Sequence, residues 1–250
     1  LNYLVGESFY MEDDFDNARK YLGTYIRNTD EDDVAHSSAL KMKKRIDTII
    51  NLKNNPVPFE PRPVKGISSP DDEYLPLISP DGEYMFYTRR YMKSDLNNIY
   101  GDKETEEFTV ADKVDSTFMN YQNKRAMPYP FNRGNNQGGV SITIDNSCLF
   151  VTQCEMVSRE YRNCDIYMSK KNDTAWGDLV NLGPNVNNKW TWESQPSISP
   201  DGKTLYFASI RPENLGSNDE YQSSDIYYSN LKEDGTWTKA KNLGRPVNTD

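Results

Sequence analysis

EYLPLISPDG at residues 73–82 returns 120 positions later as ESQPSISPDG at residues 193–202, with seven of the ten positions identical. A weaker copy, QGGVSITIDN at residues 137–146, lies between them. In the two strong copies a short apolar run meets Ser-Pro-Asp-Gly, where Pro presets the first turn residue and Gly accepts a positive φ, which predicts a hairpin. The spacings of 64 and 56 residues indicate three copies of one structural unit.

Other motifs keep the same period. DIY at residues 165–167 returns at 225–227, with NIY at 98–100 as the expected earlier member, and WGDLVNLGPNVN at 176–187 returns 61 residues later as WTKAKNLGRPVN at 237–248. Each unit is therefore predicted to contain four antiparallel strands. The second strands are expected at residues 84–88, 148–152 and 204–208, the third carry the Ile-Tyr pair, and the fourth contain the Trp segment. Four antiparallel strands per repeat is typical of a β-propeller blade.

The N-terminal residues have a different pattern. Apolar residues recur at helical spacing, most clearly in the stripe Phe15, Ala18, Tyr21, Leu22, Tyr25 and Ile26. A helix ending near Met11 is expected before this stripe, and a third helix after the polar loop at residues 29–33. Four prolines between Asn54 and Val64 exclude helix and mark a domain junction. The fold class predicted is α+β multidomain: a helical segment at residues 1–54, then β-propeller blades, incomplete in number, at residues 55–250.

These motifs support a resemblance to known families. Gly6, Phe9, Ala18 and Leu22 have the mutual offsets of the small and aromatic positions in one tetratricopeptide repeat. From about Phe59 to Asp250 the chain resembles TolB-type, WD-repeat-like propellers, although Gln137 stands where the other two copies have Glu. The combination of a tetratricopeptide segment with such a propeller is similar to that in periplasmic proteins of Bacteroidota. These proteins often continue into an OmpA-like peptidoglycan-binding domain, and some serve type IX secretion and gliding motility.

The resemblance implies a non-enzymatic scaffold in the periplasm, associated with the outer membrane. Its partners are expected to be other proteins of such an assembly, with peptidoglycan bound only through a domain that this sequence does not contain. A peptidoglycan- or glycan-binding module is the alternative, and the non-catalytic part of a propeller-containing peptidase is a third. Three blades are countable where closed propellers have four to eight, so further blades are expected beyond Asp250 and further helical repeats before Leu1.

Composition and motifs point away from catalysis. The net charge of −9 disfavours nucleic acid and anionic membranes, and no apolar run is long enough to span a bilayer. His36 is the single histidine, and no Gly-x-Ser-x-Gly motif, zinc-type spacing, phosphate loop or calcium loop is present. We therefore expect no catalytic residues, no cofactor and no metal. The aspartates of Ser-Pro-Asp-Gly are expected to accept hydrogen bonds from backbone N–H groups within their turns.

Three cysteines leave one pairing to consider. Cys154 ends one predicted strand and Cys164 starts the next, so the two can lie opposite each other across a hairpin. We expect a disulfide between them, as an oxidising periplasm would favour, and free buried thiols are the alternative. Cys148 shares a strand with Cys154 and lies roughly 20 Å from it along the strand, too far to pair.

Aromatic and basic residues supply the candidates for partner binding. Trp176 and Trp237 occupy equivalent positions and are expected to pack between blades. Trp190 and Trp192 have no counterpart at the matching positions Pro70 and Asp72, so they are candidates for anchoring a partner. Arg89, Arg90 and Arg211 are predicted to lie just after second strands, where they can line one face.

Overall fold

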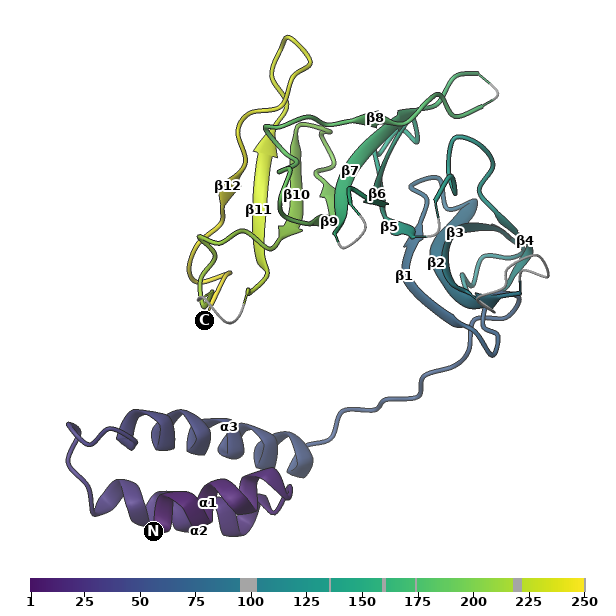
Figure 1. Ribbon diagram of the computed structural model, residues 1–250. Helices are drawn as coiled ribbons and strands as arrows, with labels where there is room; N and C mark the ends of the chain where they lie inside the picture. The colour runs from purple at the N-terminus through teal and green to yellow at the C-terminus, as the bar shows by residue number, and fades with distance from the viewer. Residues whose placement is uncertain (95–102, 135, 159–160, 174, 218–221, 250) are drawn as a thin grey trace. The chain divides into compact units, whose positions relative to one another are not determined.

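The computed structural model describes residues 1–94, 103–134, 136–158, 161–173, 175–217 and 222–249. The chain forms two compact units, Leu1–Arg62 and Pro63–Asp250 (Figure 1). The division lies inside the proline-rich segment, eight residues after the end of the last helix at Asn54. Each unit has its own buried core.

The first unit contains three helices, α1 (Asn2–Met11), α2 (Phe15–Arg27) and α3 (His36–Asn54). Asp14 caps α2, because its carboxylate accepts a hydrogen bond from the N–H of Asn17. Gly6 lies where α1 crosses α2: a Cβ at this position would stand 2.7 Å from Cγ of Leu22. Small residues at such a crossing allow the helices to approach closely, as the sequence pattern predicts. The buried centre consists of Ala18, Leu22, Ala39 and Ile46.

The second unit contains three sheets of four antiparallel strands, and within each sheet the strands are ordered as in the chain. The first sheet comprises β1 (Asp72–Ile78), β2 (Tyr84–Lys93), β3 (Lys103–Lys113) and β4 (Tyr121–Ala126). The second comprises β5 (Gln137–Ile142), β6 (Cys148–Met156), β7 (Arg162–Lys170) and β8 (Val180–Asn181). The third comprises β9 (Glu193–Ile198), β10 (Thr204–Ser209), β11 (Asp225–Asn230) and β12 (Lys241–Asn242). The prediction of three four-stranded repeats is confirmed, and the described residues do not close into a ring (Figure 1).

Strand pairing shows which positions are equivalent in the three sheets. Ile166 lies opposite Thr152 and Ile226 opposite Ala208, and Phe108 lies opposite Thr88. Phe108 therefore holds in the first sheet the place that the Ile-Tyr motif holds in the other two. The motif proposed at residues 98–100 lies outside the described residues.

The three hairpin turns have the expected chemistry. In each turn the residue at the Gly position has a positive φ, and its N–H donates to the carbonyl oxygen three residues earlier. These residues are Gly82, Asn146 and Gly202. The aspartates one position earlier accept from the backbone N–H two residues on, as in the bond from Glu83 N to Asp81. The prediction that these carboxylates serve the turns is confirmed.

Adjacent sheets pack through apolar clusters that contain the repeated tryptophans. Trp176 of the second sheet packs edge-on against Phe131, and Trp237 of the third packs edge-on against Phe150. The predicted position of both tryptophans between repeats is confirmed. The first strands are also tied to the preceding sheet, because Gly139 N donates to Thr88 Oγ1 and Gln195 N donates to Thr152 Oγ1. Because these two hydrogen bonds are equivalent, each sheet is aligned in the same way with the sheet before it.

One face of the third sheet is uncovered. Ile226 is 40% exposed, whereas its equivalent Ile166 is 0% exposed because the third sheet covers the second. Tyr206 and Phe150 differ in the same way. The uncovered face is slightly concave, with a hollow of about 350 Å³ lined mainly by apolar side chains.

Candidate partner-binding site

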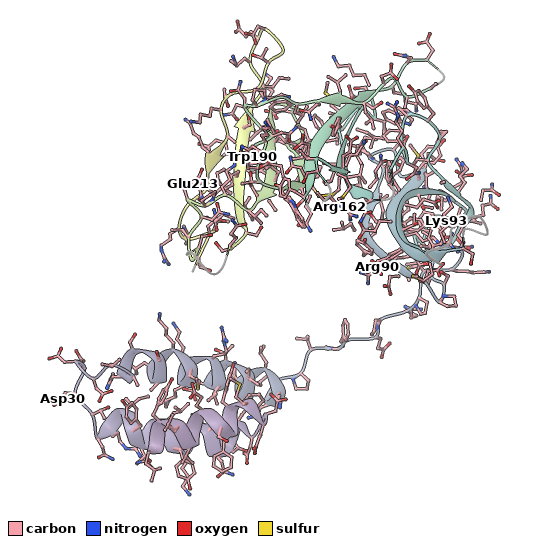
Figure 2. The ribbon with its side chains drawn as sticks, in the orientation of Figure 1. Asp30, Arg90, Lys93, Arg162, Trp190 and Glu213 are labelled. Atoms are coloured by element: carbon pink, nitrogen blue, oxygen red, sulfur yellow. A yellow bond between two sulfur atoms is a disulfide. The ribbon has the colours of Figure 1, made fainter. Side chains whose placement is uncertain are left out.

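The candidate residues gather at one edge of the β unit, which we call the entry edge. Here the loops lead into β1, β5 and β9, and here β2, β6 and β10 end. The hairpin turns lie at the opposite edge, the turn edge. Because the three sheets are in register, their entry edges form one continuous face. Figure 2 labels three of its residues, Trp190, Arg162 and Arg90.

Trp190 is the most exposed aromatic side chain among the described residues of this face. It is 67% exposed and belongs to the loop before β9, where its N–H donates to Asn188 Oδ1. Its ring lies 6.4 Å from the ring of Tyr161, and Lys189 Nζ lies 4.7 Å from its centroid. These neighbours orient the indole but leave most of its surface in solvent.

Trp192 has a different role. Its Nε1 donates to the carbonyl oxygen of Arg162 at 2.7 Å, which ties the loop of the third sheet to the start of β7. The side chain is 43% exposed. Trp192 therefore both contributes apolar surface and holds the second and third sheets together at this edge.

A cleft of about 490 Å³ opens beside Arg162, between the loop that enters β5 and the end of β6. Gln153 and Glu155 of β6 line it, together with Arg133 and Asn136 of the loop. A chain of hydrogen bonds runs from the buried Gln137 to Gln153 and on to Glu155, so the carboxylate at the mouth is anchored from below. Amides, a carboxylate and guanidinium groups thus border one cleft next to the exposed aromatic rings.

A disulfide joins Cys154 to Cys164 along this cleft. The two residues are directly paired across β6 and β7, and the bond fixes the ends of these strands at the entry edge. Cys148 is buried and free, and burial raises the pKa of its thiol to about 11. Cys148 is therefore unreactive at neutral pH.

Arg89 and Arg90 lie within β2 and not after it, because this strand continues to Lys93. Each is paired with an acid of the entry segment at 2.6 Å, Arg89 with Asp71 and Arg90 with Asp72. Arg89 also stacks over the ring of Tyr91. Both guanidinium groups are partly exposed on the entry edge, but they are already engaged by carboxylates.

The expectation that Arg211 lines a binding face is wrong. Arg211 lies after β10 as predicted, but it is buried: it pairs with Glu193, donates to the carbonyl oxygen of Val186 at 2.7 Å and stacks over Tyr227. Glu193 is 0% exposed, and burial raises the pKa of its carboxyl, although bonds from Asn188 N, neighbouring hydroxyls and Arg211 oppose the shift. This ion pair is part of the core.

Sequence reasoning missed one repeated structural device. Asn187 accepts from Ile166 N and donates to Ile166 O, and Asn248 does the same to Ile226. Asn132 holds Phe108 in the first sheet in the same way. The signal was present, because Asn187 and Asn248 end the two copies of the Trp segment. Each side chain joins the third strand of its sheet to the loop that follows the fourth strand.

The single histidine of the chain lies in the helical unit. His36 starts α3, and its Nδ1 is hydrogen bonded to Thr29 Oγ1. Within the described ranges no three His, Cys, Asp or Glu side chains are grouped so that they can hold a metal ion. No described helix has the length and apolar character needed to cross a membrane.

Comparisons with known proteins give distant structural similarity. No family model matches the sequence, and no curated protein matches it. A puromycin-hydrolysing peptidase of Mycobacterium tuberculosis is similar over 77% of this chain with 11% identity and a TM-score of 0.46, and a puromycin hydrolase over 74% with 13% identity and 0.44. An α-L-arabinofuranosidase of Clostridium thermocellum is similar over 75% with 13% identity and a TM-score of 0.38.

The chain spans about a quarter of the two hydrolases, 26% and 25%, and 60% of the arabinofuranosidase. Similarity at this level concerns the β fold and says nothing of a shared activity.

Proposed function

We propose that the chain is a non-enzymatic protein-binding scaffold, with a tetratricopeptide-like helical unit and a TolB-type propeller segment whose entry edge docks a protein partner. The motif resemblance supports a periplasmic, outer-membrane-associated assembly as its setting, such as one serving type IX secretion or gliding. The observation that carries the docking proposal is the exposure of Trp190 beside a polar cleft.

Trp190 is a better candidate than its neighbours for physical reasons. It is large and mostly solvent-exposed, and it breaks the repeat pattern, so folding alone does not require it. A tryptophan buried at the centre of an interface commonly contributes about 2 kcal/mol or more to binding. Trp192 lies next to it, but its bond to Arg162 gives it a structural role as well. The paired Arg89 and Arg90 belong to the rim of this face, where charges contribute less.

The test is partner capture with Trp190→Ala, which leaves the bond of Trp192 intact. Partners captured by the wild-type chain are identified and then titrated against both forms. Ile144→Ala is the control, because Ile144 is as exposed but lies at the turn edge. We expect Trp190→Ala to weaken binding at least tenfold at unchanged melting temperature and Ile144→Ala to bind as the wild type. Equal binding by Trp190→Ala would refute docking at this edge.

The double variant Trp190→Ala, Trp192→Ala separates docking from folding. Loss of partners at an unchanged melting temperature supports docking by both residues. A melting temperature several degrees lower with partners retained shows that the pair serves the fold.

A glycan-binding function is the second candidate, because the cleft with its anchored amide and carboxylate adjoins, at Arg162, the loop that carries the exposed tryptophans. Aromatic rings beside hydrogen-bonding side chains suit sugar rings as well as peptides. Co-sedimentation with purified peptidoglycan that Trp190→Ala abolishes would favour this function over protein docking.

A further inference from the structure

A second hollow lies on the opposite, turn edge of the β unit, between the first and second sheets. Its volume is about 300 Å³, at the small end of ligand pockets. Its apolar lining includes Phe86, Val110 and Met127 of the first sheet and Ile142 and Trp176 of the second. We call it the inter-sheet slot.

The junction between the second and third sheets shows how the same place is filled. Pairing makes Met168 the equivalent of Val110, since they lie opposite Phe150 and Phe86. Met168 packs into the apolar cluster of its junction, where Trp237 is only 5% exposed. Trp176, the equivalent of Trp237, is only partly buried. A shorter side chain at position 110 therefore leaves room that methionine occupies in the sister junction.

A lysine at the rim of the slot has no ion-pair partner within the described residues. Leu231 pairs with Trp237 in the third sheet, whereas Lys171 pairs with Trp176 in the second. Lys171 Nζ lies 5.9 Å from the Trp176 ring, and the Asp81 carboxylate, which also lines the slot, acts on it through charge. No carboxylate of the described residues lies within ion-pair distance of Lys171. A cation beside an apolar hollow favours an occupant that carries a negative charge.

Asn146 gives independent support. It lines the slot, and its buried Oδ1 accepts no hydrogen bond within the described part of the chain. Buried polar atoms are nearly always paired, so this unpaired acceptor calls for a hydrogen-bond donor, either an N–H of a ligand or a water. The other charged groups are engaged: Arg125 pairs with Asp112, and Asp81 accepts from Ser79 and Glu83 N within its turn.

We propose that the inter-sheet slot binds an apolar group, an aromatic ring or branched aliphatic chain, that carries a carboxylate. The apolar part packs between Val110 and Trp176, the carboxylate lies at the rim near Lys171, and an N–H of the occupant or a water donates to Asn146 Oδ1. Two sources share this chemistry, the C-terminal residue of a polypeptide and a free apolar carboxylic acid. The site lies at the opposite edge from Trp190 and is independent of the docking proposed there.

The test is titration of the full 250-residue chain, by calorimetry and tryptophan fluorescence, with four probes. The carboxylates are 4-phenylbutyrate and N-acetyl-Ala-Leu-Phe, and the neutral controls are 4-phenylbutanol and the C-terminal amide of the same peptide. We expect one saturable site for at least one carboxylate, at least tenfold tighter than for its neutral control. Binding by the peptide alone assigns a polypeptide C-terminus, and binding by phenylbutyrate alone assigns a free acid.

Three variants locate the site with residues taken from the sister repeat. Val110→Met should fill the slot and weaken binding at least tenfold without lowering the melting temperature, while Met168→Val, the reverse change at the other junction, should leave binding unchanged. Lys171→Leu should abolish the preference for carboxylate over neutral probe. Asn146→Gly should fold normally, because Asn146 has a positive φ and Gly202 is its equivalent. It should weaken binding of the peptide, whose N–H groups can donate to Oδ1, more than binding of phenylbutyrate, which has no donor.

The inference is overturned if none of the probes saturates at about 10 mM, a concentration at which even millimolar sites fill. It is also overturned if neutral probes bind as tightly as carboxylates, or if Val110→Met binds like the wild type. Should Val110→Met fail to fold, Lys171→Leu and Asn146→Gly decide the question, and unchanged carboxylate binding in both would refute the site.

Discussion

Replacing Arg211 by methionine should destabilise the β unit by about 3 kcal/mol at pH 7. Removing one partner of a buried ion pair generally costs about 3 to 5 kcal/mol, because a charge stays buried without compensation. Glu193 is 0% exposed, so its carboxylate has no access to water after the change. Asn188 N and the hydroxyls of Thr191 and Ser209 still donate to it, which places the cost at the lower end of this range.

The pH dependence of this cost identifies its cause. Burial already raises the pKa of Glu193 in the folded protein, and loss of Arg211 removes an interaction that lowers it. Because the folded state then binds the proton more tightly than the unfolded state, its stability increases as the pH falls. The loss of stability in Arg211→Met relative to wild type therefore has its full size at pH values above the pKa of Glu193 in the folded variant. It becomes smaller as the pH falls from there to the pKa of Glu193 in the folded wild type. Urea unfolding at pH 8, 7, 6 and 5 measures it.

The second sheet supplies the control for this experiment. Gln137 occupies the position of Glu193 and is satisfied by neutral partners, including the N–H of Asn132. The double variant Glu193→Gln, Arg211→Met should thus recover stability to within about 1 kcal/mol of wild type. A cost for Arg211→Met below about 1 kcal/mol, or one that is equal at pH 5 and pH 8, would refute a buried charge as the cause.

Two further outcomes are expected. Free-thiol titration of the unreduced, denatured chain should find one reactive thiol, Cys148, and three would show that Cys154 and Cys164 are unpaired; replacing both paired residues by serine should cost about 2 to 3 kcal/mol. Gly138→Ala brings a Cβ to within 2.2 Å of a side-chain oxygen on β2 and should cost about 1 to 3 kcal/mol, whereas Gly134→Ala, with no atom nearer than 3.8 Å, should melt like the wild type. Equal melting temperatures of the two alanine variants would contradict the close packing of β5 on the first sheet.

The repeat pattern predicts the strands well because turns and apolar runs are local features. Ser-Pro-Asp-Gly predicts its hairpins from backbone preferences alone, and the strands on either side are confirmed. The first sheet shows the limit of motif matching. Phe108 serves there as the equivalent of Ile166, and a packing position accepts any side chain of suitable size and polarity.

The candidate site was less predictable because the burial and ion pairing of a side chain depend on neighbours distant in sequence. Arg89 and Arg211 both follow the motif, but at different distances, so that Ser209 and not Arg211 is the equivalent of Arg89, and the acid available to each arginine differs. Asp71 lies at the surface and holds Arg89 there, whereas Glu193 points inward and takes Arg211 into the core. The offset from the motif distinguishes the two positions, but it does not indicate which acid each arginine meets.

The uncovered face of the third sheet extends the same argument to the whole repeat. Ile166 and Ile226 stand in identical DIY motifs, and one is buried while the other is 40% exposed. Nothing in the local sequence distinguishes them; only the presence of a following sheet does. A residue that is buried between sheets in one repeat is therefore apolar in the equivalent position of the next repeat, whether or not a sheet covers it there. The exposed Ile226 and Tyr206 have the chemistry of a junction, and a sheet that presented a Trp237-like ring to them would bury both as the third sheet buries Ile166 and Phe150.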